Sequence, residues 1–291
     1  HSMETYDFST LYTALPHVEI KQKLASIFRK VFNREAKPYI KVSFKETFFS
    51  SSLKKCNCSF RVEDMIEILE FILDNIFVKF GKEIHKQVIG IPIGLDSGQD
   101  IANLLLFSYE SEYVENLSKT NLGLARKFDL CARYIDDLFV GNFPDFRDHI
   151  YRIYPRELEI KLESDNNKQV SYLDLNLISE NNTLTYSVYD KRDSFTFEIV
   201  NFPFMDSCIP KKSALGVFTS QLIRYSRLCK KFQDFQTRAI SLINKLRSQG
   251  YQNNDLKRLS LRFFQSRSDI LGRFNIRNGN DFVRKILQGV R

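Results

Sequence analysis

The apolar positions of this chain repeat with two periods, and these periods predict both helices and strands. In residues 17–33 the apolar side chains of Ile20, Leu24 and Phe28 share one stripe, so we expect an amphipathic helix there. Residues 65–80 repeat the pattern as far as Gly81, a residue type that commonly ends helices, and predict a second, well-buried helix.

Shorter apolar runs bounded by turn residues favour strands. Residues 43–60 have no clear period, and we expect a loop or a hairpin there. The other predicted elements are strands at 6–8, 86–94, 157–162, 170–178 and 183–190, and helices over 100–117, 144–153 and from residue 213 to Gly250. This order predicts a mixed α+β protein with a small antiparallel sheet, packed helices and a helical C-terminal part.

Two adjacent acids interrupt the apolar run "RYIDDLFV" at residues 133–140. The flanking runs predict a β-hairpin with Asp136 and Asp137 at or near its turn. Neighbouring carboxylates repel each other, and a buried charge needs a partner. A divalent cation would be such a partner, and Asp7 in the strand-like "TYDFS" is the natural third carboxylate. Nucleotidyl transfer uses two cations about 3.5–4 Å apart, and Mg²⁺ prefers carboxylate oxygens as ligands.

Charge is divided unevenly along the 291 residues. From residue 205 onward there are 18 Lys and Arg, 5 Asp and no Glu, so this part carries +13 and residues 1–204 carry −5 of the net +8. A basic part beside a mildly acidic one is typical of a protein that holds a polyanion, although a solvated basic face has the same composition. Two prolines in residues 201–212 interrupt the pattern, so we predict two domains, 1–204 and 205–291.

The composition also narrows the class of protein. A hydrophobic fraction of 43% suits a globular chain with a real core. No apolar run approaches the roughly 20 residues of a membrane-spanning helix, and no secretory leader is visible near the start, so no membrane partner is expected. Five scattered cysteines fit a reducing, intracellular compartment.

Three segments in order, "YDFSTLYTALPH", "VIGIPIG…ANLLLFSYE" and "RYIDDLFV", resemble the palm signatures of reverse transcriptases. Four others, "LDNIFVKFG", "SYLDLNL", "YDKRDSFTFEIVNFPF" and "GVFTSQLIRYSRLC", resemble the Penelope-like retroelement reverse transcriptases, a group akin to telomerase. The resemblance runs from Tyr6 to about residue 265. It implies a right-hand polymerase palm over 1–204, an α-helical thumb over 205–291, and RNA-directed DNA polymerase activity in the nucleus.

The same resemblance implies roles for single residues. It makes Asp7, Asp136 and Asp137 the catalytic carboxylates that hold two Mg²⁺ (or Mn²⁺) ions, with Asp136 as a direct ligand of both and the carbonyl of Phe8 as a further metal contact. The nucleotide-binding residues that it implies are Tyr12, Gly90, Pro92, Gly94 and Lys168. Tyr12 would exclude a ribose 2′-OH, with ordinary aromatic packing as the alternative. Lys168 would protonate pyrophosphate, with Lys161 or a merely solvated lysine as alternatives.

For the basic C-terminal part, the resemblance implies a thumb that holds a duplex. The partners are then an RNA template and a DNA primer, paired as a hybrid, together with dNTPs. Phosphate contacts of this kind give affinity without reading sequence, and the binding weakens with salt. The nucleic-acid-binding residues, interleaved with Tyr225 and Phe232, are Lys211, Lys212, Arg224, Arg227, Lys230, Lys231 and Arg238.

Two departures from the family pattern leave a second hypothesis open. Reverse transcriptases carry fingers upstream of the first Asp, and this chain starts just before Asp7, so we expect missing fingers and weak activity for the chain alone. The family also reads Gly-x-x-Met-Gly-Thr-x-Cys-Ala-Pro where this chain has "GIPIGLDSGQ". Both favour a domesticated, non-catalytic module that binds nucleic acid or protein as a scaffold. The three acids and Tyr12 favour the polymerase. An RNA-dependent RNA polymerase is disfavoured by the Tyr12 gate and by Tyr-Ile-Asp-Asp, because Gly-Asp-Asp is usual in that class.

Overall fold

The computed structural model describes residues 2–52, 58–164, 166–181, 183–197, 199–267, 272–276 and 278–287. The chain forms two compact units, each with its own apolar core: an N-terminal unit, Ser2–Asp165, and a C-terminal unit, Asn166–Arg291. The domain boundary predicted after residue 204 was placed by charge and stays a prediction. In the described part of the chain, no helix is both long and apolar enough to cross a membrane.

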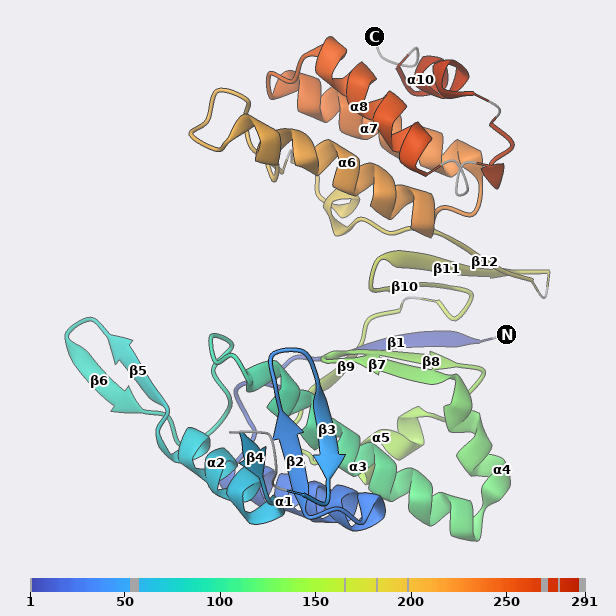
Figure 1. Cartoon of the computed structure of the whole chain (residues 1–291). Helices are drawn as coiled ribbons and strands as arrows, with labels where there is room; N and C mark the ends of the chain where they lie inside the picture. The colour runs from blue at the N-terminus through green and yellow to red at the C-terminus, as the bar shows by residue number, and fades with distance from the viewer. Residues whose placement is uncertain are drawn as a thin grey trace. The chain divides into compact units, whose positions relative to one another are not determined.

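The N-terminal unit combines one main sheet, several small β elements and four longer helices (Figure 1). Its strands are β1 (Met3–Phe8), β2 (Tyr39–Val42), β3 (Thr47–Ser50), β4 (Ser59–Phe60), β5 (Phe77–Phe80), β6 (Glu83–Lys86), β7 (Cys131–Tyr134), β8 (Asp137–Gly141) and β9 (Ile160–Leu162). Its helices are α1 (His17–Glu35), α2 (Val62–Asp74), α3 (Gly98–Thr120), α4 (Leu122–Ala125), η1 (Arg126–Leu130) and α5 (Arg147–Ile153).

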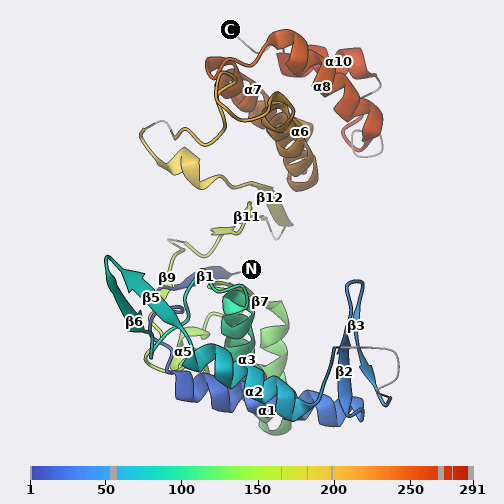
Figure 2. The ribbon, with the colours of Figure 1, turned by 60° about the vertical axis from the view of Figure 1, so that its left-hand side comes forward.

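The main sheet is antiparallel with strand order β7-β8-β1-β9. Side chains alternate between its faces, and Tyr6, Phe8, Leu138 and Val140 are all buried on the face that carries the core. Helices α1, α2, α3 and α5 lie on one side of this sheet (Figures 1 and 2). Burying one large apolar side chain stabilises a fold by about 1.5–3 kcal/mol, so this layer fixes the sheet firmly.

Several predicted elements are confirmed. The helix over 17–33 is α1, in which Ile20 and Leu24 are buried, and the long helix after residue 100 is α3. The hairpin is formed by β7 and β8. The helix predicted over 144–153 is α5, although it begins at Arg147. The small antiparallel sheet of an α+β fold is therefore present.

The helix predicted over 65–80 is wrong in its second half. Helix α2 ends at Asp74, where the side-chain amide of Asn75 donates to the carbonyl of Phe71 at 2.7 Å. The aromatic and β-branched run that follows is strand β5, which pairs with β6 as a two-stranded hairpin. Gly81, expected to end a helix, has φ +63° and forms the hairpin turn. The apolar residues of this run fit both the helical period and the strand period, and the turn at Gly81 favours the hairpin.

Two predicted strands are also placed wrongly. The strand expected over 86–94 is not formed: β6 ends at Lys86, and Ile89 makes only an isolated bridge with Pro16. The strand expected over 170–178 is broken by a turn in which Leu173 has φ +53°, so it becomes two antiparallel strands. A positive φ at leucine is costly, and nothing in the local pattern announces it.

The C-terminal unit has a three-stranded antiparallel sheet and a helical bundle (Figure 2). Its elements are β10 (Gln169–Tyr172), β11 (Leu175–Glu180), β12 (Thr183–Val188), η2 (Lys191–Ser194), α6 (Lys211–Leu228), α7 (Phe232–Ser248), α8 (Asn253–Ser266) and α10 (Gly279–Leu287). Phe218, Phe235, Phe263 and Phe282 are almost completely buried among these helices. The predicted helical C-terminal part is confirmed, with Gly250 just after α7 at φ +88°.

Candidate active site

Two of the three acids face each other across adjacent strands of the main sheet. Asp7 of β1 and Asp137 of β8 are directly paired, and paired residues of antiparallel strands project from the same face. Their neighbours in the strands, Tyr6 and Leu138, are paired in the same way and are buried on the core face. Both acids therefore lie on the face opposite the core, where each is only half-buried. This position explains why two carboxylates are tolerated in an apolar run.

The third acid sits in the hairpin turn itself. Tyr134 pairs with Asp137, which leaves Ile135 and Asp136 as the two central turn residues. Ile135 has φ +55°, which suits a tight hairpin but is strained for a β-branched side chain. The N–H of Phe8 donates to the carbonyl of Asp136 at 3.1 Å, so the turn is also bonded to β1. Strain of about 1–3 kcal/mol is maintained only where the surrounding structure enforces it.

Tyr12 lies close to the acids. Burial, and then the charge of Asp136, raise the pKa of its phenol. The hydroxyl of Ser9 donates to Asp7 Oδ2 at 3.0 Å on the same side of the site. The carbonyl of Tyr12 accepts from the N–H of Ile91 at 2.8 Å, which joins the segment after β1 to the segment before α3. The structure thus brings the predicted gate residue together with the carboxylates.

The backbone of Gly90 lies close to the backbone of Tyr12. A Cβ at Gly90, where φ is +81°, would lie 2.4 Å from the carbonyl oxygen of Tyr12. The N–H of Gly90 donates to Leu15 O at 2.8 Å, and its carbonyl contacts His17 Nε2 at 2.8 Å. The close backbone approach expected of this glycine therefore has an internal reason. Gly94, by contrast, has open space where a Cβ would be, and Pro92 is half-buried beside it.

The two candidate lysines are placed differently. Lys161 of β9 pairs directly with Asp7, so it projects from the same face of the sheet as the acids, and its Nζ lies 3.2 Å from Glu159. Lys168 belongs to the C-terminal unit, where it is exposed and its N–H donates to Asn166 Oδ1 at 2.9 Å. Of the two, Lys161 is the one that the register brings to the acids.

No curated protein matches this chain. A family model described as an animal helix-turn-helix domain matches residues 205–260. The structure of telomerase from Candida albicans in complex with a TWJ fragment of telomeric RNA aligns with 99% of this chain and 48% of its own, at 9% identity and a TM-score of 0.58. Apo telomerase from Candida tropicalis aligns with 98% of this chain and 48% of its own, at 12% identity and a TM-score of 0.45.

The first of these likenesses decides the fold. The chain has a telomerase-like reverse-transcriptase fold. An identity of 9% supports the fold and no finer statement, and the chain spans 48% of the length of that telomerase chain. The predicted fold class, an α+β polymerase palm followed by a helical thumb, is thereby confirmed.

The palm residues suit a metal site that a substrate completes. In the described residues, no three His, Cys, Asp or Glu side chains form a group that could hold an ion by themselves. Mg²⁺ commonly takes only one or two carboxylates from the protein, with phosphate oxygens and water as its remaining ligands. The carboxylates of Asp7, Asp136 and Asp137 have the donor chemistry for this. The carbonyl of Phe8 already accepts from the N–H of Leu11 at 3.3 Å and keeps a second lone pair.

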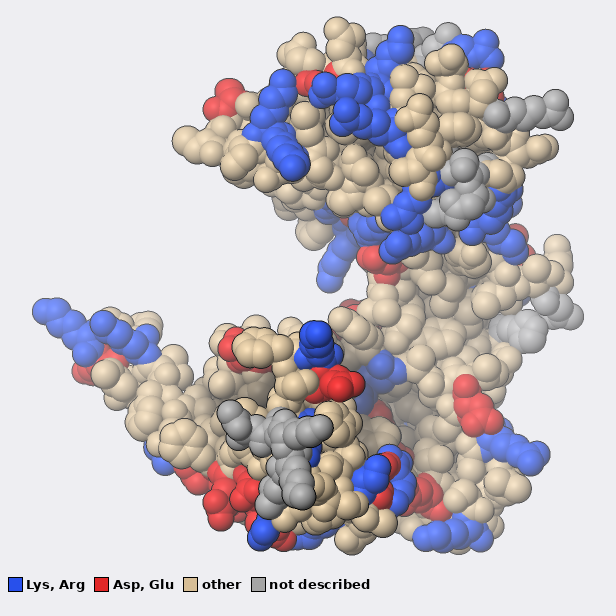
Figure 3. Space-filling view, viewed as in Figure 1, with Lys and Arg blue, Asp and Glu red and all other residues tan. Residues whose placement is uncertain are grey.

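The predicted nucleic-acid-binding cations of the thumb fall into two groups. Lys and Arg side chains gather over the helical part of the C-terminal unit (Figure 3). Three of the seven are ion-paired within the unit: Lys211 with Asp255, Arg224 with Asp174 and Arg238 with Asp193. The other four are exposed: Lys212, Arg227, Lys230 and Lys231. The second group is therefore the one open to phosphates.

The two aromatic residues between these cations are not free for base stacking. Tyr225 is 4% exposed in the core of the C-terminal unit. Phe232 packs against Phe235 and Phe274, with ring centroids 6.1 and 5.9 Å away. The interleaving of aromatic and basic residues in the sequence is therefore the helical period of the core, because the aromatic side chains face inward.

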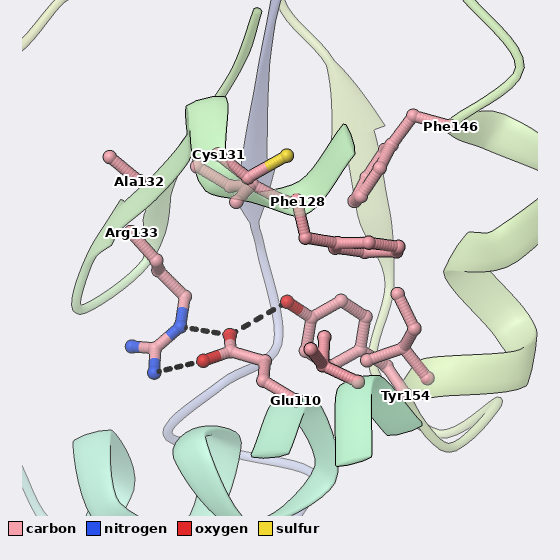
Figure 4. Close-up of a pocket in the computed structure, with 10 residues that line it drawn as sticks. Glu110, Phe128, Cys131, Ala132, Arg133, Phe146 and Tyr154 are labelled. Carbon is pink, nitrogen blue, oxygen red and sulfur yellow. Dashed lines mark hydrogen bonds and ion pairs between the residues drawn. The ribbon is translucent and has the colours of Figure 1, made fainter. Parts of the chain in front are cut away.

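Sequence reasoning missed the polar network beneath the hairpin. Arg133 pairs with the buried Leu138, so its side chain projects to the core face, where it meets Glu110 of α3. Tyr154 donates to the same carboxylate at 2.7 Å (Figure 4). The alternation of the strand carries a signal, since it places an arginine on the core face and a buried arginine requires an acid. Which acid it meets depends on the packing of α3.

Proposed function

We propose that this chain is the palm and thumb of a Penelope-like reverse transcriptase, an RNA-directed DNA polymerase that works in the nucleus. The observation that supports this best is the register of the palm sheet. It sets Asp7 beside Asp137 on the open face, with Asp136 in a turn that is bonded to β1. A merely structural sheet gains nothing from three carboxylates at one place, because they repel each other.

The reaction is the attack of a primer 3′-OH on the α-phosphate of a dNTP. A bond forms between the 3′ oxygen and the α-phosphorus, the bond from that phosphorus to the pyrophosphate oxygen breaks, and the hydroxyl proton passes to solvent water. Two Mg²⁺ ions, held by Asp7, Asp136 and Asp137 with the Phe8 carbonyl, would lower the pKa of the attacking hydroxyl and stabilise the leaving group's charge. Lys161, which pairs with Asp7, is one proposed donor of the proton that pyrophosphate takes, and Lys168 is its competitor.

Tyr12 is the proposed gate for the sugar. It is half-buried near Asp136, and its backbone is fixed by the bond to Ile91, so the ring has a defined position beside the acids. A 2′-OH would clash with such a ring, which selects dNTPs by exclusion. Gly90, Pro92 and Gly94 form the neighbouring segment of the proposed nucleotide site.

The thumb would hold the RNA/DNA hybrid through its exposed cations. Lys212, Arg227, Lys230 and Lys231 are open to solvent on or beside α6 and α7. The similar telomerase structure from Candida albicans is a complex with a TWJ fragment of telomeric RNA, which supports RNA binding. Contacts to phosphate would give an affinity that falls steeply with salt.

The proposed metal site is tested by measuring Mn²⁺ binding to the chain by calorimetry, with an RNA/DNA primer–template present. Asp136→Asn and Asp7→Asn should each weaken the binding at least ~10-fold, since each removes a charged ligand. Asp148→Asn makes the same change at an exposed position of α5 and should have no effect. Primer extension with dNTPs should be lost in the same two variants. Duplex binding without metal binding in the unmodified chain would support the scaffold alternative.

A second measurement tests the gate. Tyr12→Ala should allow incorporation of rNTPs by an active preparation, because the ring that excludes the 2′-OH is gone. Tyr151→Ala is a matched control, since Tyr151 is an exposed aromatic of helix α5. Unchanged sugar preference in Tyr12→Ala would assign Tyr12 to packing.

A further inference from the structure

Arg133 is a buried charge on the strand that leads into the catalytic hairpin. It pairs with Leu138 of β8, which is 3% exposed, and the Arg133 side chain itself is 7% exposed. A guanidinium in such a place is costly unless its N–H groups and its charge are fully matched. The hydrogen-bond partners of Arg133 therefore indicate the role of this residue.

Most of these partners lie on helix α3. The Nε and Nη2 groups of Arg133 donate to the two oxygens of Glu110, the second at 3.0 Å. Its Nη1 donates to Asn103 Oδ1 at 2.7 Å, and Nη2 reaches the Asn103 carbonyl at 3.3 Å. On the far side of the Glu110 carboxylate, the Tyr154 hydroxyl donates to it (Figure 4). The guanidinium group of Arg133 is thus bonded to two successive turns of helix α3, which packs in the core.

One further bond connects this anchor to the turn. The Nη1 group of Arg133 also donates to the carbonyl of Ile135, at 3.0 Å. Ile135 is the residue with φ +55°, and its carbonyl belongs to the peptide that leads directly into Asp136. The same guanidinium therefore holds helix α3 with one part and the strained peptide beside the acids with another.

Packing alone does not hold the underside of the hairpin. A cavity of about 140 Å³ lies beside the network, and Cys131, Arg133 and Leu138 of the two hairpin strands contribute to its lining. Phe128 and Phe146 close other sides of it (Figure 4). Where side chains leave such a space, the position of the strand depends more on its hydrogen bonds.

We propose that Arg133 is a positioning residue, which fixes the Ile135 peptide to helix α3 and so sets the carboxylates of Asp136 and Asp137 for metal binding. This inference rests on the proposed function of the acids. Arginine is required because its planar fork donates in several fixed directions at once, whereas an ammonium group is a point charge without this geometry. Glu110 and Tyr154 act through Arg133, by fixing its orientation.

The test compares two variants of the full chain with matched controls. Arg133→Lys keeps the charge opposite Glu110 but loses the fork, and Arg152→Lys makes the same exchange at an exposed site. The double variant Arg133→Met with Glu110→Gln removes both charges of the pair together, which avoids an unpaired ion, and leaves Tyr154 an acceptor. Urea unfolding and duplex binding establish that each variant is folded.

Three readouts then address positioning. Mn²⁺ affinity should fall about 10- to 100-fold in Arg133→Lys and in the double variant, as it does when residues that orient metal ligands are removed. Where primer extension is measurable, kcat should fall by a similar factor while the KM for dNTP stays within about twofold. Hydrogen exchange of the amides of residues 134–138 and of Phe8 should become at least ~10-fold faster.

Folded variants with Mn²⁺ affinity and hairpin exchange equal to those of the unmodified chain would overturn the inference and leave Arg133 as a structural ion pair. If the unmodified chain binds no Mn²⁺, the proposed function fails. Hydrogen exchange still decides the anchoring in that case: unchanged exchange at the hairpin in both variants would reject it.

Discussion

The hairpin that carries the acids and the basic surface of the C-terminal unit hold their charged side chains in opposite ways. In the N-terminal unit, Arg133 is 7% exposed and bonded on every side, and Asp7 and Asp137 meet through strand pairing between distant parts of the chain. In the C-terminal unit, cations lie on helix surfaces, and some pair with acids that are largely exposed, such as Asp174 at 56%. The first arrangement gives a site of one defined geometry. The second gives a positive electrostatic field to which many residues contribute.

This difference predicts how each unit responds to change. A site made by register and buried bonds fails when one member is altered, because no neighbour replaces it. A basic surface loses affinity in small, nearly equal steps as cations are removed. Four predictions probe the comparison, in order of decreasing effect on free energy.

The largest effect should come from the cores, and it should stay within one unit. Phe218→Ala in the C-terminal unit and Phe146→Ala in the N-terminal unit each empty a fully buried site and should each cost about 3–5 kcal/mol of unfolding free energy. Since the two cores are separate, hydrogen exchange should become faster in the mutated unit and stay unchanged in the other. Phe44→Ala, at an exposed position, is the control. Equal acceleration in both units would show that they unfold together.

Gly90 should be the next most sensitive position. Gly90→Ala introduces a Cβ that meets the Tyr12 carbonyl at 2.4 Å, at a φ that alanine avoids, and should destabilise the N-terminal unit by more than about 1 kcal/mol. Urea unfolding measures the loss. Gly94→Ala in the same segment meets open space and should be close to neutral. A neutral Gly90→Ala would mean that the Tyr12 segment moves easily, which would also weaken the case for a fixed gate.

The two units also differ in how much of their structure could be predicted from the sequence. The helices of the thumb and its basic character follow from apolar period and composition, which are local properties. The site of the palm needs the pairing of Asp7 with Asp137, and no local pattern contains it. The family resemblance brought these acids together, but it did not identify Arg133 or Glu110. Their contact depends on how α3 packs under the hairpin.

The wrongly predicted elements also have physical causes. The run after Asp74 fits a helix by period, but Asn75 and the Gly81 turn make it a hairpin. The strand expected over 170–178 is divided by a turn at Leu173, where φ is +53°. In both elements a turn overrode the apolar pattern of the segment.

The thumb cations give the third prediction, which separates the exposed from the ion-paired group. Lys231→Ala should reduce the slope of log affinity against log salt by about 0.9 and lower the affinity for an RNA/DNA hybrid several-fold, without a change in stability. Arg224→Ala removes a half-exposed ion pair with Asp174, so it should cost at most about 1 kcal/mol of stability. Fluorescence anisotropy at several salt concentrations measures the slope. The same slope for Lys231→Ala and the unmodified chain would exclude Lys231 from the phosphate contacts.

The smallest effect concerns a thiol beneath the hairpin. Burial, and then the charge of Glu110, raise the pKa of Cys131 to about 12 from an ordinary value of 9.0. The unfolded chain therefore loses this proton first as the pH rises. The contribution of this thiol to stability is complete well below pH 9 and is lost as the pH rises toward 12, with about 0.4 kcal/mol already lost at pH 9. Urea midpoints at pH 7 and pH 9 should thus differ less for Cys131→Ala than for the unmodified chain, while Cys208→Ala, at an exposed site, should match the unmodified chain. An equal pH response in Cys131→Ala would mean that this thiol is hydrated, and hence that the underside of the hairpin opens readily even with Arg133 in place.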